Sequence, residues 1–299
     1  MIYLSLVGEQ PLPILLPLWQ ENEYADVWLL ASQTTLGIAK TLAEYISTDP
    51  TLRHLRVREP EVIDAYNLTE ARKSISEIID RLEGNQEILI NLTGGTKIMS
   101  LAAMQAGRVS QITLLYVSTE EHNLSYFHAD SDVRETKPIQ VKISVSQYLN
   151  AHGLETSDSQ NFSYKYSDIA PKKEGDDLEN KVYALASDSG LFDDVQQNVF
   201  IRKKNAEKAV MNELDVVVIH NGNLAVCSCK SGKVDNQALY ELSSLSRREV
   251  AGIYCAKALA SSKPELPPGV VNRAREDHIR LICAGELDKT AQILFQITQ

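Results

Sequence analysis

The chain has 299 residues, a length that suggests about two domains with a hydrophobic core in each. Hydrophobic residues make up 43% and charged residues 23%, as is usual for a globular protein. The net charge is −10, with 12 basic and 19 acidic residues over 1–150 and 18 and 21 over 151–299, so neither half is a polycation and any nucleic-acid contact needs a local basic patch.

No apolar stretch reaches the length of a membrane span, and no signal peptide is evident. The four cysteines, Cys227, Cys229, Cys255 and Cys283, all fall in apolar runs of the second half. A zinc site built on Cys227 and Cys229 would lack a second pair of ligands, so buried thiols are expected instead. We expect a soluble, cytoplasmic protein with reduced thiols and no membrane partner.

Strand-like and helix-like segments alternate along the first half at the spacing of βαβ units. Strands are expected over five apolar runs, at residues 2–7, 27–31, 52–57, 87–92 and 112–117, with a short hairpin from Tyr126 and residues 139–143. Helices are expected between them, up to Trp19, up to Ser47, over 69–83 and from Ile98 onward. This alternation predicts a doubly wound parallel sheet in a first domain over residues 1–150.

Small or polar residues follow several of these strands, at the edge where ligands bind in such sheets. They are Gly8, Glu9, Gln10, Ser32, Gln33, Thr34, Asp64, Tyr66, Thr93, Gly94, Gly95, Thr96 and Lys97. For each of the groups at 8–10, 32–34 and 64–66 taken alone, an ordinary loop or helix cap is the better explanation. The expectation of a ligand site therefore rests on the last group.

That last group belongs to the stretch Asn91–Ser100, NLTGGTKIMS, which runs from a strand through a glycine turn into a helix. Gly94 and Gly95 permit a tight turn and a close backbone approach. Thr96 and Lys97 fall in the first helical turn, where free N–H groups attract a negative group and Lys97 adds a full charge. The stretch is not a Walker A loop, because Thr96 rather than glycine precedes Lys97. It predicts a site for a phosphate or another anion.

A polar segment separates the halves, and we expect a linker over residues 151–172 and a second domain over 173–299. The second domain is expected to hold helices over 175–190, 234–247 and from Glu286, and strands over 195–202, 213–219, 224–230, 252–255 and 279–283. Asn221 and Gly222 give a strong signal for a hairpin turn between two of these strands.

Glu179, Asp215, Ser228 and Lys230 are the candidates for chemistry in this second half. The hairpin can place Asp215, near the start of one strand, beside Lys230, at the end of the next. A carboxylate beside a lysine suits a divalent metal site that orients an attacking water, and Glu179 could supply another oxygen ligand. Taken singly, Asp215 is equally well explained as a turn residue and Lys230 as a strand-end charge.

The first half resembles the CARF domains (CRISPR-associated Rossmann fold). The resemblance rests on the Gly8 loop, on Ser32 and Gln33, and on NLTGGTK before a helix of small residues, and it covers about residues 1–145. It implies a homodimer that binds a cyclic oligoadenylate, most often the tetra-adenylate, across a two-fold axis.

The resemblance also implies roles for the residues of the expected ligand edge. Lys97, Thr96 and backbone N–H groups would hold phosphates. Ser32, Gln33 and Asp64 would contact riboses or adenine edges.

The second half resembles the PD-(D/E)xK nuclease superfamily, over about residues 172–299. In that pattern the helix glutamate matches Glu179, the strand aspartate matches Asp215 and the lysine matches Lys230. Cys229 fills the free middle position, whose backbone carbonyl often helps to hold metal in this family. The implied metal ligands are therefore Glu179, Asp215 and Cys229.

The family has an acid where this chain has Ser228, and a neutral hydroxyl is a weak metal ligand. The resemblance therefore implies a degenerate domain, an altered copy with Ser228 introduced, or a site in which Glu179 and Asp215 suffice. Basic residues near the expected cleft would bind phosphates or form a solvated strand end, and these are Arg202, Lys203, Lys204, Lys208 and Lys233.

Together, the halves resemble the ancillary nucleases of type III CRISPR defence that cyclic oligoadenylate activates. The expected fold is a Rossmann-like doubly wound CARF domain followed by a restriction-endonuclease-like α/β domain. The main expectation is a ligand-gated nuclease, dependent on Mg²⁺ or Mn²⁺, that cuts DNA, RNA or both without sequence specificity. A second expectation, which Ser228 favours, is a sensor and binding module that does not cut. A third is slow cleavage of the ligand by the CARF site itself.

Overall fold

A computed structural model describes residues 1–82, 87–128, 130, 134–157, 173–204, 212–245, 251–253 and 255–299. The chain divides into two compact units, Met1–Val141 and Lys142–Gln299. Each unit is built around a β-sheet of its own. Of the described helices, none combines the length and apolar character needed to cross a membrane.

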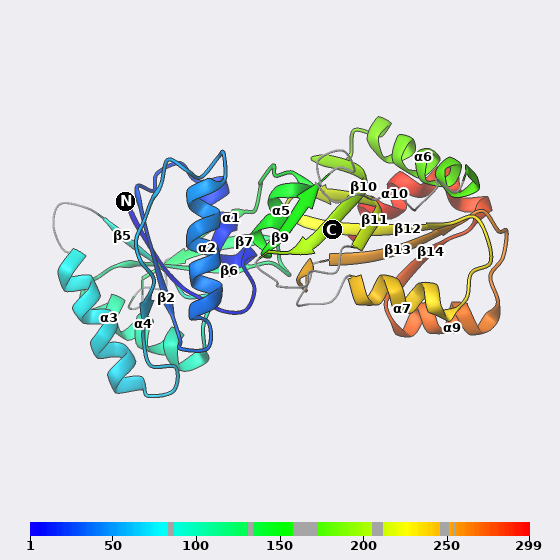
Figure 1. Cartoon of the computed structure of the whole chain (residues 1–299). Coiled ribbons are helices and arrows are strands. Elements are labelled where there is room, and N and C mark those ends of the chain that lie inside the picture. The colour runs from blue at the N-terminus through cyan, green and yellow to red at the C-terminus, as the bar shows by residue number, and fades with distance from the viewer. Residues whose placement is uncertain are drawn as a thin grey trace. The chain divides into compact units, whose positions relative to one another are not determined.

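The first unit contains a sheet whose central strands are parallel (Figure 1). Its strands are β1 (Ile2–Leu6), β2 (Asp26–Ala31), β3 (Arg56–Val57), β4 (Glu61–Val62), β5 (Ile88–Asn91), β6 (Thr113–Ser118), β7 (Asn123–Phe127) and β8 (Arg134–Pro138). They are ordered β3-β2-β1-β5-β6-β7-β8, with β4 also paired to β2. β7 and β8 add an antiparallel hairpin at one edge.

Helices cover both faces of this sheet, and they are α1 (Leu12–Gln20), α2 (Leu36–Thr48), α3 (Leu68–Leu82) and α4 (Lys97–Val109). Helices α3 and α4 pack one core with the sheet residues Leu4, Leu30 and Ile90. Tyr3 is adjacent to Leu4 and so points to the opposite face, where its hydroxyl donates to the carbonyl of Ile14 in α1 at 2.9 Å. The expected doubly wound sheet is confirmed.

The order of the strands reverses between β1 and β5. From β1 the chain runs outward through β2 to β3 and then returns to β5 on the other side of β1. In open parallel sheets such a switch point leaves a crevice beyond the carboxyl ends of the strands. The loops after β1 and β5 flank this position, so the fold places the Gly8 loop next to the NLTGGTK loop.

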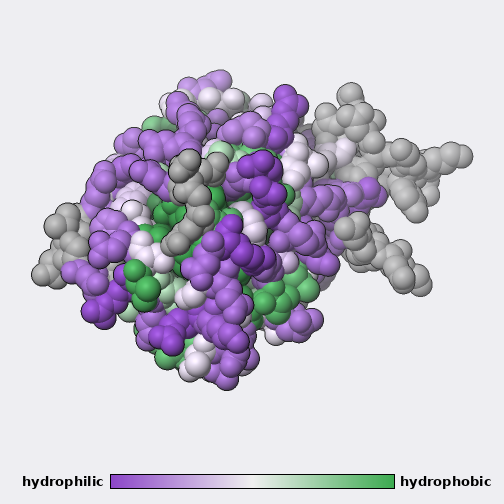
Figure 2. Space-filling model, turned by 90° about the vertical axis from the view of Figure 1, so that its left-hand side faces the viewer, coloured by the Kyte–Doolittle hydropathy of each residue, from purple (hydrophilic) through white to green (hydrophobic). Residues whose placement is uncertain are grey.

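The surface of the first unit is mostly hydrophilic on the face that Figure 2 presents, with hydrophobic side chains showing between the polar ones. Tyr66 and Val109 are the most exposed of the large hydrophobic residues described, each at 82%. Tyr66 follows β4, and an exposed aromatic ring therefore lies at the carboxyl edge of the sheet.

Two strands expected in the first half were placed wrongly. Of residues 52–57, only those of β3 pair in the sheet, and Leu52 and Leu55 are buried within a turn. Residues 139–143 form no strand either: β8 ends at Pro138, and the buried Ile139 adds one backbone hydrogen bond to the carbonyl of His122 at 2.8 Å. In both segments the hydrophobicity reflects burial against the core rather than strand pairing.

The second unit contains a mixed sheet in the order β14-β13-β12-β11-β10-β9. Its strands are β9 (Leu154–Ser157), β10 (Asp194–Lys203), β11 (Asn212–His220), β12 (Asn223–Lys230), β13 (Cys255–Ser261) and β14 (Ile279–Ile282). β9 to β12 are antiparallel neighbours, whereas β12, β13 and β14 are parallel. The expected hairpin at Asn221 and Gly222 is the β11–β12 turn.

The helices of this unit are α5 (Val145–Ala151), α6 (Lys173–Asp188), α7 (Asn236–Leu245), α9 (Pro268–Glu276), the 3₁₀ turn η1 (Ala284–Lys289) and α10 (Thr290–Ile297). α6 and α10 pack on one face of the sheet, through Leu178, Val182 and Leu294 against Val216 and Cys227. α7 and α9 lie on the other face (Figure 1). This helix–sheet–helix arrangement agrees with the expected α/β domain.

The expected strand at 252–255 was misplaced, because β13 begins where that segment ends and runs through small residues. The expected linker over 151–172 begins with strand β9, and its remainder, residues 158–172, lies outside the described residues. Cys227 and Cys229 are free and buried, as expected, whereas Cys255 and Cys283 are free and half-buried.

Candidate functional site

The loops after β1 and β5 touch through their glycines. A Cβ placed on Gly94 would lie 2.0 Å from the carbonyl oxygen of Leu6, and one on Gly8 would lie 3.2 Å from the backbone nitrogen of Gly95. Gly95 has a φ of +74°, a left-handed conformation that favours glycine. The absence of side chains at these positions lets the two backbones meet at the switch point.

Asn91 and Thr93 fix the loop after β5. Asn91 is fully buried, and its Nδ2 donates to the hydroxyl of Tyr3 at 2.6 Å and to the carbonyl of Pro13 at 2.8 Å. Its Oδ1 accepts from the backbone N–H and the hydroxyl of Thr93, and Thr93 Oγ1 in turn accepts from Val117 N at 2.8 Å. Asn91 was not among the expected site residues, although an amide at the end of an apolar strand is the signal that identifies such a tie.

Thr96 begins α4 and ties it to the loop after β4. Its Oγ1 donates to the carbonyl of Ala65 at 2.5 Å and accepts from Met99 N at 3.2 Å, which caps the helix. The hydroxyl of Thr96 is thus engaged within the protein. Its contribution to the site is to position the helix N-terminus, where the side chain of Lys97 is exposed.

Ser32 and Asp64 also hold local structure with their side chains. Ser32 is 6% exposed, and its Oγ accepts from Thr35 N at 3.1 Å. Asp64 Oδ1 accepts from the backbone N–H groups of Tyr66 and Asn67, each at 2.8 Å. These backbone hydrogen bonds lower the pKa of the Asp64 carboxyl.

All the expected ligand residues therefore follow β1, β2, β4 or β5, at one edge of the sheet. Their roles divide between shaping the loops and presenting atoms to solvent. The exposed members are Glu9, Gln33, Thr34, Asp64, Tyr66, Gly95 and Lys97, and Gly8, Gln10, Thr93, Gly94 and Thr96 are half-buried. The exposed cation, Lys97, and the backbone N–H groups suit phosphate groups, and the exposed ring of Tyr66 suits a planar base.

In the second unit, three neighbours converge on one oxygen of Asp215. Oδ2 accepts from Ser228 Oγ at 3.0 Å and from the backbone N–H of Cys229 at 2.7 Å, and it lies 3.9 Å from Lys230 Nζ. The side chain of Asp215 is 17% exposed and that of Lys230 is 36% exposed. The hairpin therefore brings an accessible lysine beside a largely buried carboxylate, as the sequence pattern predicted.

The register of the hairpin decides which way this cluster points. Val216 pairs with Cys227, and both belong to the core beneath α6 and α10. Because side chains alternate along a strand, Asp215 and Ser228 point to the other face. Asp215 and Ser228 are therefore cross-strand neighbours at the end of the hairpin remote from its turn.

Glu179 is half-buried on α6, on the face of the sheet to which the Cys229 side chain points. A hydrogen bond with the side chain of Cys227 is the largest of the effects that raise the pKa of the Cys229 thiol, burial is the next, and the charges of Asp215 and Glu179 contribute. The Cys229 thiol therefore stays protonated and is unsuited to binding metal as a thiolate. Its backbone carbonyl is the atom left for such a role.

The donor set is poor for a hard cation. Across the described ranges, no three His, Cys, Asp or Glu side chains are grouped so as to hold a metal ion. Asp215 and Glu179 supply carboxylates, whereas Ser228 supplies only a hydroxyl that already donates to Asp215. Because Mg²⁺ and Mn²⁺ prefer several oxygen ligands, and anionic ones above all, these residues fit a weakly held divalent ion.

The basic residues expected near the cleft do not form one free patch in the described part of the unit. Arg202 pairs with Glu155 at 2.5 Å, which ties β10 to β9. Lys203 and Lys233 are exposed, and Lys208 lies outside the described residues. Arg202 therefore supports the sheet, and the exposed lysines are the ones placed to meet a phosphate backbone.

Two families match the chain, one in each half. Residues 2–148 match the family described as the Card1 CARF domain, and residues 172–298 match the family described as the Card1-like endonuclease domain. No curated protein matches the chain in sequence.

Solved structures share the fold along nearly the whole chain. Protein VC1899 from Vibrio cholerae superposes with a TM-score of 0.83 at 18% identity, covering 99% of this chain and 97% of that one. Can2 from Sulfobacillus thermosulfidooxidans, in complex with cyclic tetra-adenylate, gives 0.80 at 19% identity over 98% and 99%. A type III CRISPR defence DNA nuclease activated by cyclic oligoadenylate gives 0.64 at 16% identity over 90% of this chain and 47% of that one.

Proposed function

Because the chain belongs to the Card1-like family, in which a CARF domain precedes an endonuclease domain, we propose that it is a nuclease activated by cyclic oligoadenylate in type III CRISPR defence. Its substrate is DNA, RNA or both, cut without a fixed recognition sequence. It acts in the cytoplasm, as a homodimer, with Mg²⁺ or Mn²⁺ as the metal.

The observation that carries this proposal is the convergence of Ser228, Cys229 and Lys230 on Asp215. All three contacts engage Oδ2, so Oδ1 is the carboxylate oxygen of Asp215 that would bind a cation. This is the arrangement expected of the PD-(D/E)xK pattern, with a serine in place of one acid.

Asp215, Glu179 and the carbonyl of Cys229 would hold the metal. The chemistry of such a metal is to polarise the scissile phosphate and to make an attacking water more acidic. Lys230, exposed beside Asp215, donates to a phosphate oxygen and stabilises the negative charge that develops there. Asp215 holds that lysine near the phosphate by charge attraction.

The activator is cyclic tetra-adenylate in this proposal. Its phosphates meet the N-terminus of α4 and Lys97, where an exposed cation adds to the positive end of the helix dipole. Its adenines face Tyr66 and Gln33, which are exposed at the same sheet edge. A ligand with two-fold symmetry suits two copies of this edge, one from each protomer.

A cleavage assay with the full chain tests the proposal. Single-stranded DNA, single-stranded RNA and duplex DNA are incubated with Mg²⁺ or Mn²⁺, with and without cyclic tetra-adenylate, and sedimentation reports the oligomeric state. Cleavage that needs both metal and cyclic tetra-adenylate, from a dimer, is expected. Binding of no cyclic oligoadenylate of any ring size contradicts the sensing role.

A second function is favoured by one observation, the hydroxyl of Ser228 donating to Asp215 where a third carboxylate would concentrate charge. A site with too little charge to keep its metal would leave a protein that senses cyclic oligoadenylate and binds nucleic acid without cutting it. Binding of both ligands with no cleavage at any Mn²⁺ concentration would identify this function.

A further inference from the structure

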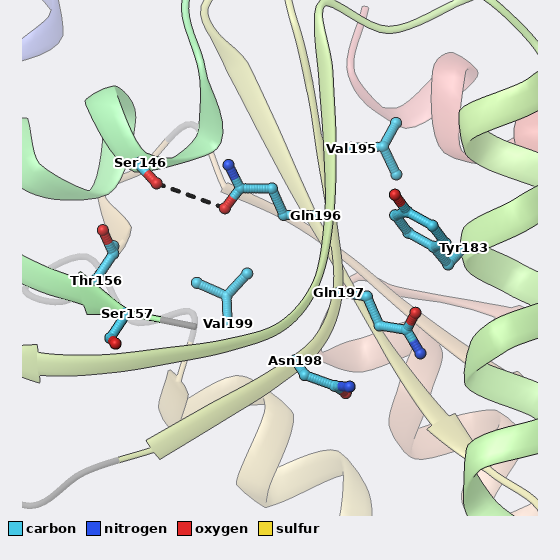
Figure 3. A pocket seen from close by; sticks show the side chains of 9 residues that line it. All are labelled: Ser146, Thr156, Ser157, Tyr183, Val195, Gln196, Gln197, Asn198 and Val199. Atoms are coloured by element: carbon cyan, nitrogen blue, oxygen red, sulfur yellow. Dashed lines mark hydrogen bonds between the residues drawn. The ribbon is translucent and has the colours of Figure 1, made fainter. Parts of the chain in front are cut away.

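A polar cavity of about 620 Å³ opens in the second unit where β10 passes between α5, β9 and α6 (Figure 3). Its lining consists of hydroxyls, amides and two valines, from Ser146, Thr156, Ser157, Tyr183, Val195, Gln196, Gln197, Asn198 and Val199. This volume lies within the range of small-ligand sites, which is roughly 300–1,000 Å³.

The chemistry of the lining selects an uncharged, planar guest with hydrogen-bonding edges. No charged side chain is among the described residues that line it, so the cavity is unsuited to a phosphate or a metal ion. Gln196 Nε2 donates to Asp194 Oδ2 at 2.8 Å and Gln197 Nε2 donates to Asn180 Oδ1 at 2.9 Å, so Asn198 is the amide that offers a donor and an acceptor to a guest. The ring of Tyr183 offers a face on which a base can stack. A nucleobase has this combination of a π-face and a polar edge.

Two placements put the cavity near the proposed nuclease centre, on the face of the sheet that α6 and Glu179 cover. Tyr183 lies four residues after Glu179 on α6, so the two share one side of the helix, about 6 Å apart along its axis. On β10, Gln197 pairs with Val216 and Val199 with Leu214, so the backbone of Asn198 is level with that of Asp215 on the neighbouring strand.

Asn198 has an unusual backbone for its position. Its φ is +53°, the left-handed region that few residues other than glycine occupy within a strand. Figure 3 shows its side chain and that of Gln197 on the Tyr183 side of β10, whereas Gln196 turns to Ser146, with Ser146 Oγ donating to Gln196 Oε1 at 3.5 Å. Such backbone strain concentrates where a side chain is positioned for a ligand.

We propose that this cavity holds one base of the nucleic-acid strand presented to Asp215, stacked on Tyr183 and bonded through its edge to Asn198. The inference rests on the proposed nuclease function and refines it. The strand is cut without a recognition sequence, but a base in this cavity sets where along the strand the phosphate meets Lys230.

Binding measured without cleavage tests the inference. The full chain with cyclic tetra-adenylate is titrated in EDTA into a fluorescent single-stranded DNA oligonucleotide, and into the same backbone without bases. Tyr183→Ala should weaken binding of the base-bearing strand about tenfold and leave the abasic strand unchanged, because one stacking contact is lost. Tyr183→Phe keeps the ring and should bind as the parent does.

Two further variants separate a site from a structural role. Asn198→Gly retains the left-handed backbone but removes the amide, and should reduce discrimination among strands that differ in base. Tyr116→Ala removes a half-exposed tyrosine on β6 of the first unit, outside the cavity, and should change neither titration. Thermal unfolding of each variant identifies any loss of the fold. The difference in strand binding between Tyr183→Phe and Tyr183→Ala shows whether the aromatic ring contributes.

The outcomes distinguish this inference from the proposed function. If the parent and Tyr183→Ala bind the base-bearing strand equally, the cavity is not a base site, while the nuclease proposal stands. If the parent does bind nucleic acid but prefers the abasic strand or shows no preference, the inference is also overturned. If the parent binds no nucleic acid, both the proposed function and this inference are contradicted.

Discussion

The ligand edge of the first unit and the Asp215 cluster of the second unit are built from different kinds of atoms. At the ligand edge, the backbones approach so closely that a Cβ on Gly94 would overlap the carbonyl oxygen of Leu6, and the hydroxyls of Thr93 and Thr96 hold the loops. In the Asp215 cluster, three groups meet one carboxylate oxygen. Close backbone packing determines the first site, and interactions with a charged carboxylate determine the second.

This difference teaches what each site tolerates. A site made by shape is damaged by one added methyl group, even though that group carries no charge. A site made by charge is changed by one added or removed carboxylate within the same backbone. Substitutions at the two sites should therefore differ in whether they change folding stability or ligand and metal binding.

Gly94→Ala should damage the first unit most. The new Cβ would lie 2.0 Å from the Leu6 carbonyl oxygen, and relieving this overlap should cost about 3 kcal/mol or more of folding stability. Gly37→Ala is the matched control, because a Cβ there meets nothing within 4 Å and an alanine in α2 should stabilise slightly. Denaturant unfolding measures both. Equal stability of the two variants would show that the glycine contact does not shape the edge.

Lys97→Ala should weaken binding of cyclic tetra-adenylate by roughly 1.5–3 kcal/mol, the scale of a hydrogen bond to a charged group. Lys73→Ala is the control, since Lys73 is an exposed lysine of α3 whose ion pair with Glu77 spans 4.0 Å. Calorimetry gives both affinities. An unchanged affinity for Lys97→Ala would remove this lysine from the site.

Acid should lower the folding stability of the second unit more than that of the first. Burial lowers the pKa of His152 to about 4 from 6.5, so the unfolded second unit binds a proton that the folded one does not. The resulting stability is complete above pH 6.5 and falls as the pH drops toward 4. In the first unit, a hydrogen bond from Arg56 lowers the pKa of Asp26, and that contribution is lost only as the pH falls below 3.8.

The second unit should therefore lose roughly 2 kcal/mol between pH 7 and pH 5 that the first unit keeps. Trp19 and Trp28 both belong to the first unit, so tryptophan fluorescence follows that unit while circular dichroism follows both. The two melting curves should diverge at pH 5, and His152→Gln should reduce the divergence. Coincident curves at both pH values would argue against a buried neutral histidine.

Ser228→Glu should raise ligand-dependent cleavage at least about tenfold, corresponding to roughly 1.4 kcal/mol at the transition state. The added carboxylate lies across the strand pair from Asp215 and increases the negative charge that holds a divalent ion, so the metal concentration needed should fall. Adding Asp215→Ala to this variant should abolish the gain. A parent that already cuts as fast as Ser228→Glu would mean that Glu179 and Asp215 suffice.

Much of the first unit could be predicted because its signals are contiguous. The NLTGGTK loop lies between a buried strand and a helix, and its position at the switch point follows from the βαβ order. The position of Asn91 at a strand end signals a buried hydrogen bond, but its partners Tyr3 and Pro13 could not be predicted because they are distant in sequence. Leu52 and Leu55 misled the strand assignment, because hydrophobicity reports burial and not pairing.

The Asp215 cluster was predictable for a different reason. The turn at Asn221 and Gly222 sets the register that brings residues of two strands together, so the neighbours of Asp215 follow from counting outward from the turn. The cavity at Tyr183 and Asn198 was not predictable, because a left-handed residue within a strand leaves no mark in the hydrophobic pattern.

The central claim, that a ligand on the first unit controls charge chemistry on the second, is tested most directly by one rate comparison. Cleavage of a fluorescent single-stranded DNA is followed in Mn²⁺ for the parent and for Asp215→Ala, each with and without cyclic tetra-adenylate. The account predicts cleavage only by the parent with cyclic tetra-adenylate, and none by Asp215→Ala although it binds the nucleotide normally. Equal rates with and without cyclic tetra-adenylate, or full activity in Asp215→Ala, would contradict it.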